Sequence, residues 1–517
     1  MVSQDEKMML DVQEIISILR NPTEQDIALV HKAYDFAEKA HTGEKRLSGE
    51  PYFVHLFATA KNIADLGMSA TMVAAGFLHD SIEDTSTTLE EIEKEFGKEI
   101  LFLVEGVTKL GKIKYRGTNR HNESLRKLFV AMSQDIRVLI IKLCDRLHNI
   151  QTLEHVPEEK RLRIATETLE IYAPLAYRLG IRKLQRSLED TAFSYVYPKE
   201  YKEVSSLLKT KLSESEESLQ KFQKSLKKEL AMNGIIHFRT DYRVKGLYSL
   251  YKKLKRNDMD IEKIYDISAV RVMLPTLEEC YKVLGIVHSN WKPLPGRIKD
   301  YISTPKPNGY RSIHTTIFSG DGNVIEVQIR TEEMHNESEY GIASHISYKQ
   351  TQDENKKKQT NPNLLWVKKI LPLMNRGQTK ETKKNEKNIN LDDVPKWIKE
   401  LVDYQKDAGD KDFIDGIKND FFEERIFVFT PMGDVIDLPM GSSAIDFAYN
   451  IHSDIGNHMA GVKVNDKFVA LNTILEPGDK VEIETKKNAK PSYKWLEFCK
   501  TTIAKRHIRN ALENSKK

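Results

Sequence analysis

The sequence predicts a multidomain protein of α and α+β class, with an all-helical N-terminal region, an α/β middle region and a small β-rich C-terminal region. Apolar residues recur at helical spacing from Asp26 to Tyr197. After Asn233-Gly234 the pattern changes to short runs rich in Ile, Val and Thr, which are typical of strands. The chain has 517 residues, enough for three or four domains of roughly 100–200 residues each.

Composition excludes several classes of protein. The 80 Lys and Arg nearly balance the 76 Asp and Glu, so the chain is not basic throughout. No run approaches the ~20 apolar residues of a membrane-spanning helix, and residues 1–10 lack the apolar core of a signal peptide. The 3 cysteines are far apart and form no CxxC pair, which argues against zinc fingers and a disulfide framework. We therefore expect a soluble, cytoplasmic protein without a membrane partner.

The predicted elements follow in order along the chain. A charged helix is expected from Lys199 to Leu230. Strands are then expected at Ile235–Arg239, Ser268–Leu274, Ser312–Phe318 and Asn323–Ile329. A polar linker at Thr351–Asn390 precedes a short amphipathic helix at Trp397–Tyr404. Further strands are expected at Ile426–Phe429, Val435–Leu438, Val462–Val464 and Val481–Ile483, before a basic helical tail after Trp495.

The densest chemical signal is the run Phe77-Leu78-His79-Asp80-Ser81-Ile82-Glu83-Asp84. On a helix, residues four apart share a face, which pairs His79 with Glu83 and Asp80 with Asp84. A second motif, Cys144-Asp145-Arg146-Leu147-His148-Asn149, is also predicted on a helix, and His55 follows Pro51-Tyr52-Phe53-Val54. Two histidines and two aspartates could bind one divalent ion, and such mixed ligands suit Mn, Fe or Zn better than Ca.

The alternative for this run is a helix cap beside a solvated acidic face. Ala74, Ala75, Phe77 and Leu78 favour the metal site instead, because they direct the His-Asp pair inward, where unpaired charge is expensive.

His55, His79-Asp80 and Asp145 resemble the four ligands of the HD phosphohydrolase superfamily. With Ser48-Gly49-Glu50-Pro51-Tyr52 and Phe77 to Thr85, they are similar to the hydrolase domain of the RelA/SpoT homologues, the guanosine tetraphosphate enzymes of the stringent response. The resemblance implies Mn²⁺ held by His55, His79, Asp80 and Asp145, with Glu83 and Asp84 in water activation and proton transfer. It also implies nucleotide contacts from Arg46, Ser48, Asn149 and Thr152. The chain departs from the family at Leu47, where a second basic residue is usual.

The second signal is a basic run from Gly296 to Thr315 that contains Arg297, Lys299, Lys306 and Arg311. Prolines and glycines punctuate it, which predicts a shaped loop suited to polyphosphate. In the following strand Glu326, Gln328 and Arg330 share one face. Asp266 precedes the strand Ser268–Leu274, and with Glu326 it could hold Mg²⁺ against substrate phosphates. The alternative for the basic run is a solvated turn with incidental lysines.

The strings Lys306-Pro307-Asn308-Gly309-Tyr310-Arg311-Ser312-Ile313-His314-Thr315 and Glu326-Val327-Gln328-Ile329-Arg330-Thr331 resemble the synthetase domain of the same family. That family transfers pyrophosphate from ATP to the 3′-hydroxyl of GDP or GTP. The resemblance implies Asp266 and Glu326 at Mg²⁺, with Glu326 as the base on the 3′-hydroxyl. Tyr310 would stack on guanine, and Arg243 and Arg271 would sandwich adenine. The pocket would be completed by Lys245, Lys253, Lys299, Lys306, Asn308, His314 and Gln328.

The segments Val428-Phe429-Thr430-Pro431-Met432-Gly433-Asp434 and Ala444 to Gly456 resemble the TGS domain of long family members. The resemblance implies that this domain reads the acceptor end of tRNA on the ribosome, with His452 as a contact residue. The alternative is a structural histidine, because most single histidines are structural. Long members continue with regulatory domains beyond the point where this sequence stops.

The sequence as a whole is therefore predicted to be a bifunctional enzyme that makes (p)ppGpp from ATP and GDP or GTP and hydrolyses it to GDP or GTP plus pyrophosphate. Arg297-Ile298-Lys299-Asp300 resembles the basic form of a motif that accompanies bifunctional members. The alternatives are a monofunctional member with one degenerate site, supported only by Leu47, and a tRNA- or ribosome-binding regulator. The expected domains are an all-α HD-type hydrolase at 1–197, a nucleotidyltransferase-like synthetase at 198–350, a linker at 351–422, a TGS domain at 423–488 and the start of a helical region at 489–517.

Overall fold

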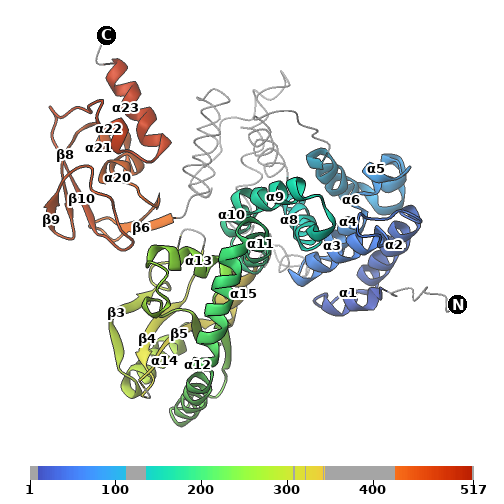
Figure 1. Ribbon diagram of the computed structural model, residues 1–517, viewed down its shortest axis with the longest axis horizontal. Helices are drawn as coiled ribbons and strands as arrows, with labels where there is room; N and C mark the ends of the chain where they lie inside the picture. Colours follow the sequence, from blue (N-terminus) through green and yellow to red (C-terminus); the bar gives the residue numbers. More distant parts are fainter. Residues whose placement is uncertain are drawn as a thin grey trace, which may run out of the picture. The chain divides into compact units, whose positions relative to one another are not determined.

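The computed structural model describes residues 10–111, 135–306, 309–320, 322–341, 343 and 425–514. The chain divides into two compact units, Met1–Gln359 and Thr360–Lys517 (Figure 1). The predicted linker at 351–422 and its helix Trp397–Tyr404 lie outside the described residues. Among the described residues, no helix combines the length and the apolar character that crossing a membrane requires.

The first part of unit 1 is all helical, as the apolar spacing predicts. Its second helix begins with a capping box between Thr23 and Asp26. The fourth helix is buried at every position except Thr71, and Gly76 lets it approach the third: a Cβ at this position would lie 2.5 Å from Cδ1 of Ile63. The helices are α1 (Val12–Ile18), α2 (Glu24–Ala40), α3 (Phe53–Asp65), α4 (Ala70–Leu78), α5 (Ser81–Asp84), α6 (Leu89–Gly111), α8 (Ile136–Gln151), α9 (Glu158–Glu167), α10 (Ala173–Arg178) and α11 (Arg182–Val196).

The second part of unit 1 is built on a five-stranded mixed sheet with the order β1-β2-β5-β4-β3. Only the pair β2 and β5 is parallel; the other neighbours are antiparallel. Its elements are α12 (Pro198–Met232), β1 (Arg239–Val244), α13 (Leu247–Arg256), β2 (Ser268–Leu274), α14 (Leu277–Asn290), β3 (Pro293–Asp300), β4 (Ile313–Phe318), β5 (Val324–Thr331) and α15 (Glu332–Tyr340).

The two faces of this sheet differ in chemistry, as the alternation in β5 predicts. Ile325, Val327 and Ile329 pack in a core with residues of α14 and of the second half of α12. Glu326 lies on the other face, where it lines a cavity. Alternate residues of a strand point to opposite faces, so one strand supplies both the core and the wall of a candidate site.

Two predictions for this sheet are wrong. The strand expected at Ile235–Arg239 instead starts at Arg239. Ile235 follows the end of α12 and packs in the hydrophobic core, which explains its apolar character without a strand. Strand β1 lies at the edge of the sheet, where polar side chains are tolerated, so its sequence lacks the apolar run that identifies a buried strand. The run from Gly296 is also not all loop: Pro293–Asp300 forms the opposite edge strand, β3, which pairs with β4 across an irregularity.

Unit 2 contains a two-stranded and a three-stranded sheet with helices packed on a single core. The four predicted strands are confirmed within a few residues. The turn between β8 and β9 has φ values of 51° and 65° at Asn465 and Asp466. The elements are β6 (Arg425–Phe429), β7 (Val435–Pro439), α20 (Ala444–Ile451), α21 (Ser453–Asn457), β8 (Met459–Val464), β9 (Lys467–Val469), β10 (Val481–Thr485), α22 (Trp495–Phe498) and α23 (Thr502–Asn514).

Candidate active sites

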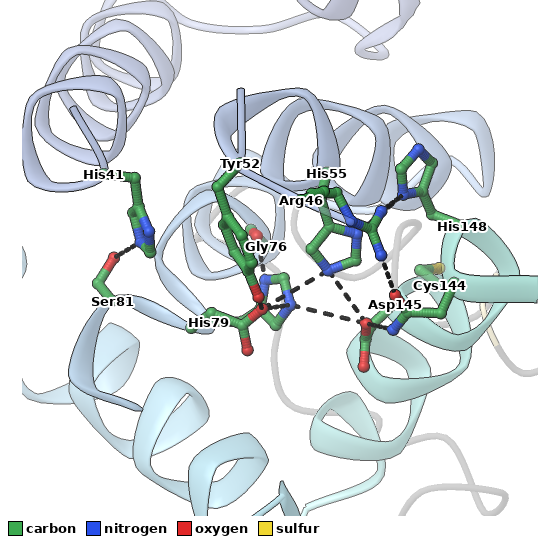
Figure 2. Close-up of polar contacts among 12 residues, drawn as sticks. His41, Arg46, Tyr52, His55, Gly76, His79, Ser81, Cys144, Asp145 and His148 are labelled. Atoms are coloured by element: carbon green, nitrogen blue, oxygen red, sulfur yellow. Dashed lines mark hydrogen bonds and ion pairs between the residues drawn. The ribbon is translucent and has the colours of Figure 1, made fainter. Parts of the chain in front are cut away.

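The helical part of unit 1 brings together His55, His79, Asp80 and Asp145, here called the His/Asp cluster. Figure 2 shows His55, His79 and Asp145 converging on one point. Nε2 of His55 lies 3.2 Å from Oδ1 of Asp145 and 3.6 Å from Oδ2 of Asp80. Nε2 of His79 lies 3.0 Å from the same Asp80 oxygen and 3.9 Å from Oδ1 of Asp145. Ligand atoms of His55, His79 and Asp80 all lie within 4.8 Å of one another.

The expectation that His79, Asp80, Glu83 and Asp84 share one continuous helix is wrong. Helix α4 ends at Leu78, and α5 begins at Ser81. Neighbouring residues on a regular helix point about 100° apart. The break at His79 and Asp80 allows two consecutive side chains to meet, which a regular helix would oppose.

Hydrogen bonds outside the cluster determine which ring nitrogens carry protons. Nδ1 of His79 lies 2.8 Å from the carbonyl oxygen of Gly76, so this nitrogen donates. Arg46 can only donate, and its Nη1 lies 2.9 Å from Nδ1 of His148, so that nitrogen accepts. Nδ1 of His55 lies 2.8 Å from the same acceptor and must donate. These bonds turn the Nε2 lone pairs of His55 and His79 toward the carboxylates.

Lone pairs that face carboxylates require a cation between them, so the His/Asp cluster fits a divalent metal ion. The pKa values of two side chains in the cluster show the strength of the charge interactions there. Burial opposes protonation of His79, but Asp80 and Asp145 outweigh it and raise its pKa to about 9, so a proton can take the place of the metal cation at Nε2. The pKa of Asp145 falls well below its usual range: burial opposes this, and Lys142, 2.7 Å away, is the largest cause.

A cavity of about 710 Å³ opens beside the cluster. All four residues expected to contact nucleotide in the hydrolase line it: Arg46, Ser48, Asn149 and Thr152. Asn149 links the nucleotide-binding residues to the His/Asp cluster, because it accepts from Nη2 of Arg46 at 2.6 Å and donates to Oδ1 of Asp145 at 2.5 Å. Leu47 also lines the cavity, and its side chain is 71% exposed.

Glu83 and Asp84 lie on α5, directly after the cluster. Burial raises the pKa of Asp84, Tyr52 lowers it through a hydrogen bond, and Asp80 raises it further. A raised pKa favours the protonated form of this carboxyl group, which suits it to proton transfer. The hydroxyl of Tyr52 also donates to Oδ2 of Asp80 at 2.8 Å.

Sequence reasoning gave no role to Tyr52, Lys142 or His148, although all three contact the cluster. Tyr52 and His148 stand inside the recognised motifs, next to the residues that were assigned. Lys142 lies three residues before Asp145, a spacing that places both on one face of α8.

The mixed-sheet part of unit 1 contains a second cavity, of about 470 Å³, here called the basic cavity. Its acidic side chains are Asp266 and Glu326. Its cationic lining residues are Arg182, Arg243, Lys245, Lys253, Arg256, Lys263, Arg297, Lys299 and Lys306. An excess of cations around two carboxylates is the chemistry that polyphosphates and a divalent ion require.

The two carboxylates of the basic cavity are held by different partners. Oδ2 of Asp266 accepts from Lys245 at 2.8 Å and from Lys253 at 2.5 Å. Oε1 of Glu326 lies 2.7 Å from Nδ1 of His314, whose Nε2 lies 2.6 Å from the hydroxyl of Tyr310. Burial favours the protonated form of Glu326, but the hydrogen bond from His314 outweighs it and lowers its pKa. Glu326 is therefore ionised and able to accept a proton.

Not every residue predicted for the synthetase pocket lines the basic cavity. Arg271 instead pairs with Asp241 at 2.8 Å and Glu339 at 2.9 Å, although it lies on the same face of the sheet as Arg243. Gln328 is buried and does not line the cavity, and its Nε2 donates to Oε1 of Glu326 at 3.4 Å. Asn308 lies outside the described residues. The others are all lining residues: Arg243, Lys245, Lys253, Lys299, Lys306, Tyr310 and His314.

His452 in unit 2 is exposed and precedes α21, where its Nδ1 accepts from the backbone N–H of Asp454 at 3.1 Å. The imidazole thus caps a short helix while remaining on the surface. This position is compatible with both expectations for His452, a contact residue and a structural one.

Comparison with known proteins finds matches to three domain families along the chain. Family models match residues 33–182 as "HD domain", 242–353 as "Region found in RelA / SpoT proteins" and 426–485 as "TGS domain". The chain is 42% identical over 509 residues to the guanosine-3′,5′-bis(diphosphate) 3′-pyrophosphohydrolase of Aquifex aeolicus, covering 98% of this chain and 67% of that one.

It is also 39% identical over 496 residues to the bifunctional (p)ppGpp synthase/hydrolase SpoT of Escherichia coli, covering 96% of this chain and 66% of that one. Among solved structures, small alarmone synthetase 2 of Bacillus subtilis matches with 27% identity and a TM-score of 0.23, over 32% of this chain and 88% of that one. The chain thus spans about two thirds of the length of the two curated relatives.

Proposed function

The chain belongs to the RelA/SpoT family of guanosine tetraphosphate enzymes, and we propose that it both makes and hydrolyses (p)ppGpp at two separate sites. The observation that carries the proposal is the presence of two cavities with different chemistry in one compact unit. One has the His/Asp cluster at its edge, and the other surrounds two carboxylates with cations.

In the proposed synthesis, the basic cavity holds ATP and GDP or GTP. The 3′-oxygen of the guanine nucleotide attacks the β-phosphorus of ATP, forming a new P–O bond as the bond to AMP breaks. Glu326 takes the proton of the 3′-hydroxyl, since it is the ionised carboxylate on the face of β5 that lines the cavity. The lysines that line the cavity neutralise the phosphates.

In the proposed hydrolysis, the cavity beside the His/Asp cluster holds (p)ppGpp, and water replaces the nucleotide 3′-oxygen on the pyrophosphate. Arg46, Ser48, Asn149 and Thr152 would bind the nucleotide, since all four line this cavity. Glu83 and Asp84 on α5 would orient the water and transfer its proton. The products are GDP or GTP and pyrophosphate.

Each site is proposed to use its own metal ion. His55, His79, Asp80 and Asp145 would hold Mn²⁺, which suits mixed imidazole and carboxylate ligands and would polarise the scissile phosphate. Asp266 and Glu326 would hold Mg²⁺ together with substrate phosphates. Lys245 and Lys253, which donate to Asp266 in the free protein, would then donate to phosphate oxygens instead.

Two single substitutions test the two-site proposal. Glu326→Gln should abolish formation of ppGpp from ATP and GDP while hydrolysis of ppGpp with Mn²⁺ continues. Asp80→Ala should abolish hydrolysis and leave synthesis. Loss of both activities from one substitution in a protein that is still folded would contradict it. Absence of GDP release by the unmodified chain would instead favour the monofunctional alternative raised by Leu47.

We further propose that the TGS region of unit 2 contacts the acceptor end of tRNA through His452, on the ribosome. The exposure of the imidazole and the basic residues at 486–509 support this proposal. His452→Ala should weaken binding of deacylated tRNA in a filter or fluorescence assay, with exposed His237→Ala as the control. Equal affinities of the two variants and the unmodified chain would contradict a contact role.

A further inference from the structure

The helix that ends the all-helical part of unit 1 places a side chain in the basic cavity. Arg182 is the first residue of α11, and it lines the cavity together with residues of the mixed sheet. Its guanidinium carbon lies 4.2 Å from the ring centroid of Tyr310. At this distance the guanidinium is in direct cation–π contact with the ring.

Tyr310 has little free surface left beside this contact, since it is only 5% exposed. The rings of Tyr301 and His314 lie in edge-to-face geometry with it, at centroid distances of 6.0 and 5.7 Å, and Nζ of Lys306 lies 5.5 Å from its centroid. Its hydroxyl is bonded to His314. A nucleotide base can stack on Tyr310 only if a face of the ring becomes accessible, and Arg182 occupies such a face.

The fold holds Arg182 in this place through the rest of α11. Nη1 of Arg186 donates to the carbonyl of Val244 at 3.3 Å. Glu189 pairs with Lys252 at 3.1 Å, and Asp190 accepts from the backbone N–H of Tyr248 at 3.0 Å. These contacts fasten α11 to the end of β1 and to α13, which also supplies Lys253 to the cavity.

The electrostatics show that the contact is not a strong anchor for Arg182. Among the described residues no carboxylate is paired with it, and it enters a cavity already rich in cations. Its charge also contributes, after burial, to the lowered pKa of Lys306. A guanidinium in such surroundings is attracted to the ring of Tyr310 and repelled by its cationic neighbours, so a base can displace it without breaking an ion pair.

We propose that Arg182 is a cover on Tyr310 that a guanine base must displace before it can stack there. The helical part of the unit thereby opposes binding of guanine nucleotides at the synthesis site, through a side chain and not through its own catalytic residues. This inference rests on the proposed function for the role of Tyr310, but the contact itself is independent of turnover.

The test compares Arg182→Ala with Arg182→Lys, which keeps the charge but loses the planar group, and with Lys183→Ala, which removes a neighbouring exposed cation outside the cavity. In calorimetric titration of the full chain with GDP alone, Arg182→Ala should lower the dissociation constant about three- to tenfold, and Arg182→Lys should lower it less. Lys183→Ala should not change it.

In turnover, Arg182→Ala should lower the KM for GDP by a similar factor and leave the KM for ATP unchanged. In a chain that also carries Tyr310→Leu, Arg182→Ala should no longer change GDP binding, because the cover acts through that ring. A weaker or unchanged affinity for GDP in Arg182→Ala, with an unchanged unfolding midpoint, would overturn the inference. A chain that binds GDP but makes no product would contradict the proposed function and leave the binding comparison valid.

Discussion

Nδ1 of His148 lies 2.8 Å from Nδ1 of His55, across 93 positions of sequence. His148 also accepts from Arg46, and therefore receives the proton that His55 donates. Burial is the largest cause that lowers the pKa of His148, to about 3, followed by the charges of His55 and Arg46, so the ring stays neutral. His148 thus orients His55, a proposed metal ligand, through their hydrogen bond.

His148→Ala should weaken metal binding about 10- to 100-fold, because His55 would lose the partner that fixes its tautomer and rotation. Titration of ppGpp hydrolysis with Mn²⁺ measures this, and high Mn²⁺ should restore most of the rate. His237→Ala, at an exposed position, is the control. An unchanged Mn²⁺ requirement in His148→Ala would show that His148 does not position the ligand.

Lys306 predicts a pH dependence for the basic cavity. Burial, then Arg182, lowers the pKa of Lys306 to about 7, so in the free protein its charge is present below pH 7 and lost above. Bound phosphate favours the charged form and raises this pKa. ATP binding should therefore take up about one proton near pH 8 and almost none at pH 6.

Calorimetry in buffers with different ionisation enthalpies measures this uptake. Lys306→Met should remove most of it and leave the part taken up by Lys245, whose pKa burial lowers to about 8. Lys209→Met, on the exposed side of α12, should not change the uptake. Equal proton uptake by the unmodified chain and Lys306→Met at pH 8 would assign the proton to another group.

Leu47 predicts a gain of affinity at the hydrolysis site. The side chain is exposed and lines the same cavity as Arg46, so a lysine there could reach a bound phosphate without being buried. Leu47→Lys should lower the KM for ppGpp about two- to fivefold, the effect of one exposed charge pair. Leu47→Met is the control for side-chain size, and equal KM values for the two variants would rule out a phosphate contact.

Asp446 predicts a local loss of stability in unit 2. This buried carboxylate accepts from the backbone N–H groups of Ser443, Lys500 and Thr501 and from the hydroxyls of Ser443 and Thr501. It therefore joins α20 to the segment before α23. Asp446→Ala should cost about 3 kcal/mol by leaving buried donors without an acceptor.

Hydrogen exchange of α20 and α23 in the full chain measures this loss, and protection should fall in both helices together. Asp434→Ala, in an exposed turn, should leave their protection unchanged. Faster exchange confined to α20 would mean that Asp446 acts only as a helix cap.

Local patterns were enough to predict much of the fold. The strand expected at Ser268–Leu274 is β2 with the same bounds, because its buried apolar run needs no distant partner to be recognised. Strand β1 was misplaced, since its sequence Arg-Thr-Asp-Tyr-Arg-Val has little apolar signal and its strand conformation depends on pairing with β2.

The chemical content of both sites was also present in the sequence. Histidines, carboxylates and clustered cations at characteristic spacings indicated a divalent ion and a polyphosphate, because residue type sets which ligands a side chain can bind. Each of these signals lies within a short segment of the sequence, such as His79-Asp80 or the basic run from Gly296 to Thr315.

Only the tertiary structure decided how these residues are used. It placed His148 behind His55, paired Arg271 with Glu339 away from the basic cavity, and brought Arg182 onto Tyr310. Each relationship joins residues 68 or more positions apart. Proton position, ion pairing and the access of a ring face all depend on what packs against a side chain in space, which spacing along the chain does not determine.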